Sequence, residues 1–325
     1  MRKRRLRHIQ LPGRSSKVQG FRCGHKIADM PEFQVACFHK PCLSRSSILS
    51  IRIYGRFQRV RFLTMNELAS TTSDGCRLAY RFDGTAEKPV LVLSNSIGTD
   101  HTMWDPQIEA LGKHFRVLRY DSRGHGSSDV PAGPYSMDRL GPDVIELLDA
   151  LKLSRVHFLG LSLGGMAGQW LGIHAPERIN RLILANTSAY LGPADQWEGR
   201  IASALKGDRR ATADMFLGNW FPSRLLDSGG PMIEKIRAVL LATDPRGFAG
   251  SYAAVRDMDM RRAIALITAP TLVIAGQHDT VTLRSHSELI AATVPGAKLV
   301  VLPVVHLSNL EAPDAFMNAV LGFLL

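Results

Sequence analysis

The sequence predicts an α/β fold, with a doubly wound, mostly parallel sheet and an inserted helical cap. Short apolar runs typical of buried strands alternate with helical segments along most of the chain. The alternation stops between about residues 188 and 264, where only helices and loops are expected, and resumes at Pro270. We interpret the interruption as a cap over the functional site. Extra helices packed elsewhere on the sheet are the alternative.

Apolar periodicity and turn signals define the expected elements. The expected strands are 76–82, 89–93, 115–120, 156–159, 180–186, 271–275 and 298–302. Outside the cap, the expected helices are 104–111, 137–151, a run from Gly165 onward, 283–292 and 313–324. Within the cap, they are 196–205, 210–220, 231–242 and 248–258.

Residues 1–64 differ from the rest of the chain in charge. They hold fifteen of the 40 Lys and Arg residues and two of the 29 Asp and Glu residues. They also lack a sustained helical or strand period. The other 25 basic and 27 acidic residues leave 65–325 slightly acidic. The formal net charge of +11 therefore does not indicate that the folded domain binds nucleic acid.

We expect residues 1–64 to be a disordered or spurious N-terminal extension, and 65–325 to be the folded domain. A transit peptide, a tether for nucleic acid or anionic lipid, and upstream sequence read from too early a start codon are three interpretations. We favour the third, because Met65 begins a natural opening for a folded domain.

The cysteine content and the hydropathy of the sequence bear on the cellular compartment in which the protein is expected. The extension contains three of the four cysteines, without C-x-x-C spacing or suitably placed His partners, so no metal site is expected. Sparse cysteines in the remainder fit a reducing compartment. No run of 18 or more apolar residues occurs, so no transmembrane helix is expected, and no membrane partner is expected for the folded domain. These features favour a cytoplasmic location.

A strand, a tight turn and a helix meet at Ser162. The apolar run Val156–Leu159 leads into Gly160-Leu161-Ser162-Leu163-Gly164, and a helical run follows. A G-x-S-x-G frame in this setting lifts the serine hydroxyl out of the sheet at a helix N-terminus. Side chains at 160 and 164 would collide where strand and helix approach closely. The pattern therefore predicts that Ser162 is a nucleophile.

A serine nucleophile needs a base, and the base needs an orienting acid. With this kind of turn, the acid and then the histidine follow the serine along the chain. Asp279 follows the strand 271–275, and His306 follows the strand 298–302, so both are expected at the carboxyl edge of the sheet. They are the predicted acid and base. His101 is the second candidate base, and Asp121 is the rival acid.

The oxyanion of an acyl-transfer intermediate needs two N–H donors. One is expected from Leu163, directly after the nucleophile, and the other from Ile97 in the loop after the strand 89–93. Ser96 is the neighbouring alternative to Ile97. The sequence contains no complete dinucleotide fingerprint, no P-loop and no H-E-x-x-H motif. No metal and no organic cofactor are therefore expected.

With these residues assembled, the chain resembles the α/β-hydrolases, and within them the 3-oxoadipate enol-lactonase family. The resemblance covers nearly all of 65–325. Its narrower signals are SNSIGTDHTMWDPQ at 94–107 and the cap sequences at 184–201 and 240–261. The resemblance implies hydrolysis of a small anionic enol-lactone to 3-oxoadipate, in aromatic catabolism by the β-ketoadipate pathway. A general carboxylesterase or cofactor-free perhydrolase, and a non-catalytic binding protein, remain alternatives.

The implied substrate is a small molecule with a carboxylate, which a cap could hold only with a cation or convergent N–H donors. Arginine suits this task because its fork matches a carboxylate. Several cap arginines are available, and we predict Arg256 as the contact. Trp197 and Trp220 are the predicted pocket walls. The sequence leaves the oligomeric state open.

Overall fold

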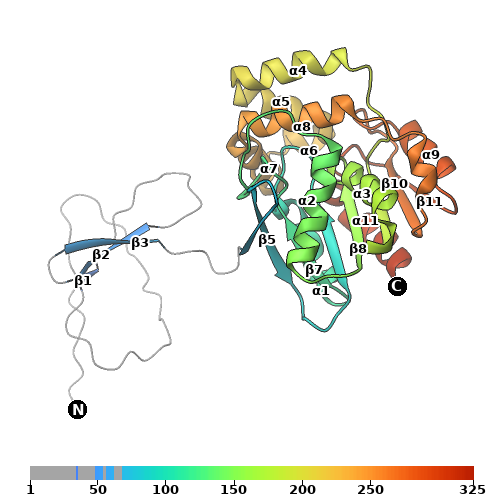
Figure 1. Cartoon of the computed structure of the whole chain (residues 1–325). Helices are drawn as coiled ribbons and strands as arrows, with labels where there is room; N and C mark the ends of the chain where they lie inside the picture. Colours follow the sequence, from blue (N-terminus) through green and yellow to red (C-terminus); the bar gives the residue numbers. More distant parts are fainter. Residues whose placement is uncertain (1–33, 36–47, 54–55, 62–67) are drawn as a thin grey trace. The chain divides into compact units, whose positions relative to one another are not determined.

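An eight-stranded sheet organises residues 68–325 of the computed structural model, which also describes residues 34–35, 48–53 and 56–61 (Figure 1). The strand order is β11 (Lys298–Leu302), β10 (Thr271–Gly276), β9 (Ile179–Ala185), β8 (Val156–Leu161), β6 (Val90–Ser94), β7 (Arg116–Tyr120), β5 (Arg77–Asp83) and β4 (Leu68–Thr71). The β4–β5 and β5–β7 pairs are antiparallel, and all other pairs are parallel. The prediction of a mostly parallel sheet is confirmed.

Apolar side chains fill the central strands because both faces of a parallel sheet are covered. One row of paired residues crosses the centre of the sheet through Val92, Phe158 and Leu182. All three side chains are fully buried. This is why these strands read as continuous apolar runs rather than as alternating patterns.

The connections place helices on both faces of the sheet. From β6, the chain forms β7 on one side and then crosses to β8 on the other. Right-handed crossovers therefore put α1 (Asp105–Gly112) on one face, and α2 (Met137–Ala150) and α3 (Leu163–His174) on the opposite face. α2 packs beside α3, and α1 packs beside α11 (Pro313–Leu324). The reversal of strand order at β6 opens a crevice at the carboxyl ends of β6 and β8, where α/β proteins bind ligands.

The inserted segment between β9 and β10 is helical (Figure 1). It contains α4 (Asp195–Lys206), α5 (Arg209–Trp220), α6 (Ser223–Asp227), α7 (Pro231–Ala242) and α8 (Pro245–Asp257). Its two connections to the sheet lie together, since Tyr190 forms a β-bridge with Asp259, and Met260 N–H donates to Ala189 O at 2.8 Å. Figure 1 shows α4, α5 and α8 stacked over one end of the sheet. Helices therefore lie over the carboxyl ends of the strands.

The remaining elements are short. η1 (His101–Trp104) precedes α1, η2 (Pro176–Arg178) precedes β9, η3 (Ala263–Leu266) precedes β10, α9 (Arg284–Thr293) joins β10 to β11, and α10 (Ser308–Glu311) precedes α11. The sequence analysis missed β4 and α6, whose four and five residues are too few to establish a period. Among the described residues, no helix is long and apolar enough to span a bilayer.

The chain divides into two compact units, residues 1–64 and residues 65–325. In the first unit, β1 (Gln34–Val35), β2 (Ile48–Ile53) and β3 (Arg56–Arg61) form a small antiparallel sheet. The sequence analysis expected no regular structure there. The other residues of this unit, including its three cysteines, lie outside the described residues. That residues 1–64 are a spurious extension stays a prediction.

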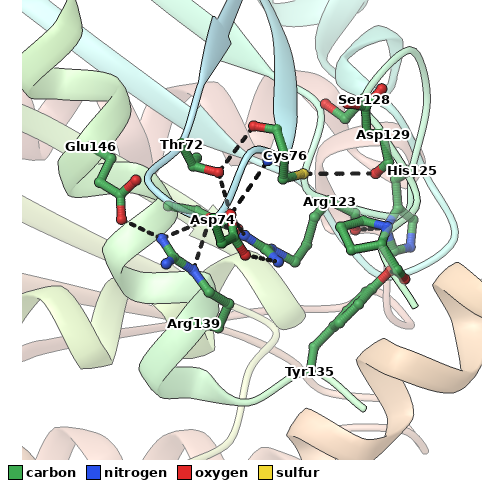
Figure 2. A network of polar contacts seen from close by, with 12 residues as sticks. Thr72, Asp74, Cys76, Arg123, His125, Ser128, Asp129, Tyr135, Arg139 and Glu146 are labelled. Atoms are coloured by element: carbon green, nitrogen blue, oxygen red, sulfur yellow. Dashed lines mark hydrogen bonds and ion pairs between the residues drawn. The ribbon is translucent and has the colours of Figure 1, made fainter. Parts of the chain in front are cut away.

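A buried arginine joins three parts of the fold (Figure 2). Arg123 follows β7 and is 2% exposed. Its guanidinium donates twice to Asp143 of α2, each time at 2.6 Å. It also donates to Asp74, in the turn between β4 and β5, at 2.9 and 3.2 Å. Hydrogen bonding from Arg123 holds the pKa of Asp74 well below its usual range, although burial acts in the opposite direction.

We expect Arg123→Met to lower the free energy of unfolding by about 3–5 kcal/mol, because it leaves the carboxylate of Asp143 buried without its main partner. Urea denaturation followed by circular dichroism measures the change. The control is Arg284→Met, which removes an exposed helical pair with Glu288 and should cost less than about 1 kcal/mol. Equal losses of unfolding free energy in the two variants would contradict the expected contribution of the buried pair to stability.

Candidate active site

Ser162 lies at the sharp turn between β8 and α3. Its φ of 57° and ψ of −116° place a non-glycine residue in a strained conformation. Its N–H donates to Ala185 O of β9 at 2.9 Å, and its carbonyl accepts from the Thr187 hydroxyl at 2.8 Å. These bonds hold the turn in place, and the side chain lies on the wall of a cavity.

The two glycines of the frame are required by close approach. A Cβ on Gly160 would lie 2.1 Å from Gly164 O, at the start of α3. A Cβ on Gly164 would lie 2.3 Å from Ser94 O, at the end of β6. Real Cβ atoms do not approach backbone oxygens so closely. Any larger residue would push α3 away from the sheet and would displace Ser162.

Asp279 and His306 meet at the ends of β10 and β11. Asp279 Oδ2 lies 2.8 Å from His306 Nδ1. Both side chains are buried, and the two strands are neighbours in the sheet. The structure therefore brings together two residues that lie 27 positions apart in the sequence.

Four further groups fix the carboxylate of Asp279. Its Oδ1 accepts from the N–H groups of Val281 and Thr282, at 2.8 and 3.0 Å. Its Oδ2 accepts from the Thr282 hydroxyl at 2.8 Å and from Asn186 Nδ2 at 3.0 Å. Burial acts to raise the pKa of Asp279, but the charge of His306 and these hydrogen bonds lower it below its usual value. Asp279 is therefore held as a carboxylate.

The imidazole of His306 faces the cavity that Ser162 also lines. Its Nε2 has no hydrogen-bond partner among the described residues. The indole of Trp220 stacks near the imidazole, with ring centroids 6.3 Å apart. With Nδ1 held by Asp279, Nε2 is the nitrogen left to exchange a proton with a group in the cavity.

Ile97 and Leu163 also line this cavity. Leu163 is the first residue of α3, so its N–H has no acceptor within the helix. The loop that contains Ile97 is tied to the turn at Ser162, because Asn95 O accepts from Gly164 N–H at 3.0 Å. The Asn95 side chain donates to Tyr120 O at 2.8 Å and accepts from the Trp104 indole at 2.9 Å. The two predicted N–H donors thus belong to one braced unit.

The cavity has a volume of about 410 Å³, which suits a small ligand. Its floor includes Ser162 and His306, and its cap side includes Trp197, Phe216 and Trp220. The two tryptophans predicted as walls are thus among the residues that line this cavity, and their contact with a substrate stays a prediction. Trp197 is held by a bond from its indole N–H to Leu191 O at 2.7 Å.

Arg256, the predicted carboxylate contact, does not line the cavity. Its guanidinium is paired with Glu198 at 2.6 Å and with Asp257 at 2.7 Å. Those two carboxylates occupy the fork, so the structure contradicts the prediction for Arg256. The arginine that does line the cavity is Arg200 of α4. The sequence analysis gave it no preference over the other cap arginines.

His286 of α9 is a second cavity residue that the sequence analysis missed. A histidine on a helix carries no local signal of function, so the sequence did not single it out. Burial lowers its pKa, partly offset by the charge of Asp279. Its Nδ1 has no hydrogen-bond partner among the described residues.

The rival candidates have structural partners. Asp121 accepts from His101 Nδ1 at 3.0 Å, from His101 N–H at 2.7 Å and from Ser127 N–H at 2.8 Å. These contacts brace the loop after β7, and neither Asp121 nor His101 is among the residues that line the cavity. Among residues 68–325 and the described strands of the first unit, no three His, Cys, Asp or Glu side chains cluster as metal ligands would.

Comparison with known proteins identifies the family. Residues 89–313 match the model of the alpha/beta hydrolase fold. The chain belongs to the α/β-hydrolase family. It is 38% identical to 3-oxoadipate enol-lactonase 2 of Acinetobacter baylyi over 249 residues, which are 77% of this chain and 93% of that protein. More distantly, it is 31% identical to a protein of Agrobacterium fabrum named putative carbamate hydrolase RutD, over 74% of this chain and 94% of that protein.

Solved structures agree. A hydrolase from Pseudomonas aeruginosa PA01 is 62% identical, with a TM-score of 0.80 over 81% of this chain and 99% of that chain. The enol-lactonase from Burkholderia xenovorans LB400 is 40% identical, with a TM-score of 0.77 over 79% of this chain and 99% of that chain. The protein is therefore similar to enol-lactonases in sequence and fold, and it is a hydrolase that acts on a carboxylic ester or lactone of a small molecule.

Proposed function

We propose that the protein hydrolyses a small anionic enol-lactone, converting 3-oxoadipate enol-lactone to 3-oxoadipate by a serine mechanism. The observation that carries the proposal is that Ser162, Leu163, Ile97 and His306 line one cavity, with His306 bonded to Asp279. The similarity to proteins named 3-oxoadipate enol-lactonase supports the substrate. In this proposal the protein acts in the β-ketoadipate pathway of aromatic catabolism, in the cytoplasm and without a cofactor.

The chemistry follows from the residues. His306 Nε2 takes the proton of the Ser162 hydroxyl as Oγ bonds to the lactone carbonyl carbon. The N–H groups of Leu163 and Ile97 stabilise the oxyanion that forms. The ring C–O bond then breaks, and its electron pair leaves as an enolate, a good leaving group. The enolate takes the proton from His306 Nε2 and becomes the ketone, which leaves His306 neutral for the second half of the reaction. An acyl-enzyme on Ser162 remains.

Deacylation repeats these steps with water. His306 takes a proton from a water molecule as its oxygen attacks the acyl carbon, and the same N–H groups hold the second oxyanion. Collapse returns the proton to Ser162 Oγ and releases the ring-opened acid. Asp279 holds the imidazole in the tautomer with Nδ1 protonated, and it stabilises the imidazolium that forms in both halves of the reaction.

Turnover of the enol-lactone tests the substrate. We expect loss of its absorbance with a kcat/KM well above that for p-nitrophenyl acetate, because the acetate ester lacks the carboxylate and the ring. Comparable values for both compounds would favour a general carboxylesterase. Absence of turnover with either compound would favour a non-catalytic binding protein.

A further inference from the structure

The charge distribution of the cavity points to the kind of ligand that it binds. Among the described residues that line it, Arg200 is the only Arg or Lys, and none is Asp or Glu. Other polar groups on the wall include the amides of Gln196 and Asn219 and the imidazole of His286. The fixed side-chain charge of the wall is therefore positive, which favours an anion.

Arg200 differs from the cap arginines that hold the structure together. Arg237, Arg256 and Arg261 each pair with a carboxylate. No ion pair joins Arg200 to a carboxylate among the described residues. The central carbon of its guanidinium lies over the ring of Trp197, 4.5 Å from the ring centroid. Stacking restrains the guanidinium while its N–H groups stay unused.

The surroundings of Arg200 are neutral on its other side as well. A second hollow of about 340 Å³ lies against Arg200, and it shares Gln196, Met215 and Tyr252 with the main cavity. The rest of its lining is Gly199, Ser203, Ala204, Ala211 and Thr212. Arg200 thus lies on the boundary of two spaces, neither of which supplies an acid among the described residues.

We propose that Arg200 sets the specificity of the cavity by binding the carboxylate of a small anionic ester or lactone while the acyl carbon lies at Ser162. The inference rests on the proposed function for the position of the acyl carbon. It assigns the acidic arm of the substrate to the α4 side of the cavity. Arg200 is exposed, so its guanidinium is accessible to a carboxylate that enters the cavity, and its fork matches the two carboxylate oxygens.

Binding of adipate tests the inference without turnover. Adipate is a dicarboxylate with the same number of carbons as 3-oxoadipate. Isothermal titration of the full chain should show its Kd raised about 10- to 100-fold in Arg200→Ala, as expected for loss of one charge-assisted contact. Arg200→Lys should lie between Arg200→Ala and the wild type, because it keeps the charge and loses the fork. Arg256→Ala is the matched control and should bind as the wild type does.

Turnover of two aryl esters shows whether Arg200 determines substrate specificity or only supports the structure. Mono-p-nitrophenyl succinate has a carboxylate at the end of its acyl arm, and p-nitrophenyl pentanoate has a methyl group near that position. Arg200→Ala should raise KM for the succinate ester about 10-fold or more and leave both constants for the pentanoate nearly unchanged. An equal loss on both esters would show that Arg200 only supports the wall at Trp197, and unchanged adipate binding would also overturn the inference.

These measurements do not depend on the enol-lactone. If the wild type fails to hydrolyse the enol-lactone but Arg200→Ala weakens adipate binding and loses the preference for the anionic ester, the role of Arg200 stands and the lactone assignment falls. If the enol-lactone is hydrolysed and Arg200→Ala changes neither adipate binding nor ester preference, the function stands and the role of Arg200 falls.

Discussion

Ser162→Ala is expected to lower kcat by roughly 10⁴- to 10⁶-fold while leaving the protein folded. The hydroxyl supplies the atom that bonds to the acyl carbon, so nothing else in the cavity can replace it in the covalent step. No hydrogen bond from the Ser162 hydroxyl to a described residue contributes to the fold; its backbone makes the contacts that hold the turn. The melting temperature should therefore change little.

Two measurements check this result. Initial rates with the enol-lactone or an aryl ester give kcat, and mass spectrometry after treatment with an aryl phosphonate shows whether Ser162 bonds covalently. The adduct should form on the wild type and be absent from the variant. Ser251→Ala is a suitable control, because Ser251 is a buried serine outside the cavity lining. Near-wild-type turnover by Ser162→Ala would rule out the serine mechanism.

Much of the site could be predicted because its signals are local. The turn at Ser162 needs glycines at fixed positions, and the clashes at Gly160 and Gly164 show why. Asp279 and His306 each follow an apolar run, and the carboxyl ends of parallel strands meet at one edge of a sheet. Their adjacency then required only that β10 and β11 pair, which they do.

The cap could not be predicted to the same depth. Which face of a cap helix meets the cavity depends on how the helices pack, and Glu198, which pairs with Arg256, comes from a different helix. One signal for Arg200 was present. It follows Trp197 by three residues, so both lie on one face of α4. Since Trp197 was a predicted wall, this spacing indicated Arg200 rather than Arg256.

The groups that hold Asp279 could not be predicted from the sequence either. Asn186 directly follows β9, and Thr282 follows Asp279 by three residues in the loop after β10. Polar residues are common in the loops that follow strands, so neither residue stands out in the sequence. Only the strand order, with β9 beside β10, shows that the Asn186 amide reaches the carboxylate. Strand order comes from packing across the whole sheet, and no local pattern encodes it.

Asp279→Asn is expected to lower kcat by about 10⁴-fold, because it reverses the hydrogen bond that sets the imidazole tautomer. The amide oxygen can still accept from the N–H groups of Val281 and Thr282. The amide nitrogen then takes the place of Oδ2. In the wild type, Oδ2 accepts from Asn186, the Thr282 hydroxyl and His306 Nδ1. A donor placed among donors favours the tautomer with the proton on Nε2, which cannot accept the proton of Ser162.

The same substitution should cost about 1–3 kcal/mol of stability, since it leaves buried donors unpaired. Thermal melting measures this cost, and Asp259→Asn, which loosens an exposed pair with Arg261, is the control for loss of a carboxylate. The lowered pKa of Asp279 fixes the sign of a further effect. Its carboxylate contributes stability fully above its unfolded pKa, near 3.9, and this contribution is lost as pH falls through the folded pKa.

Activity lost between about pH 5 and 7 therefore cannot come from protonation of Asp279, whose pKa is lowered rather than raised. The loss of activity expected for Asp279→Asn comes instead from the wrong imidazole tautomer. Asp279→Asn should thus be impaired across this whole range instead of recovering at higher pH. A folded Asp279→Asn enzyme with more than about a tenth of wild-type kcat at pH 8 would mean that another acid orients His306.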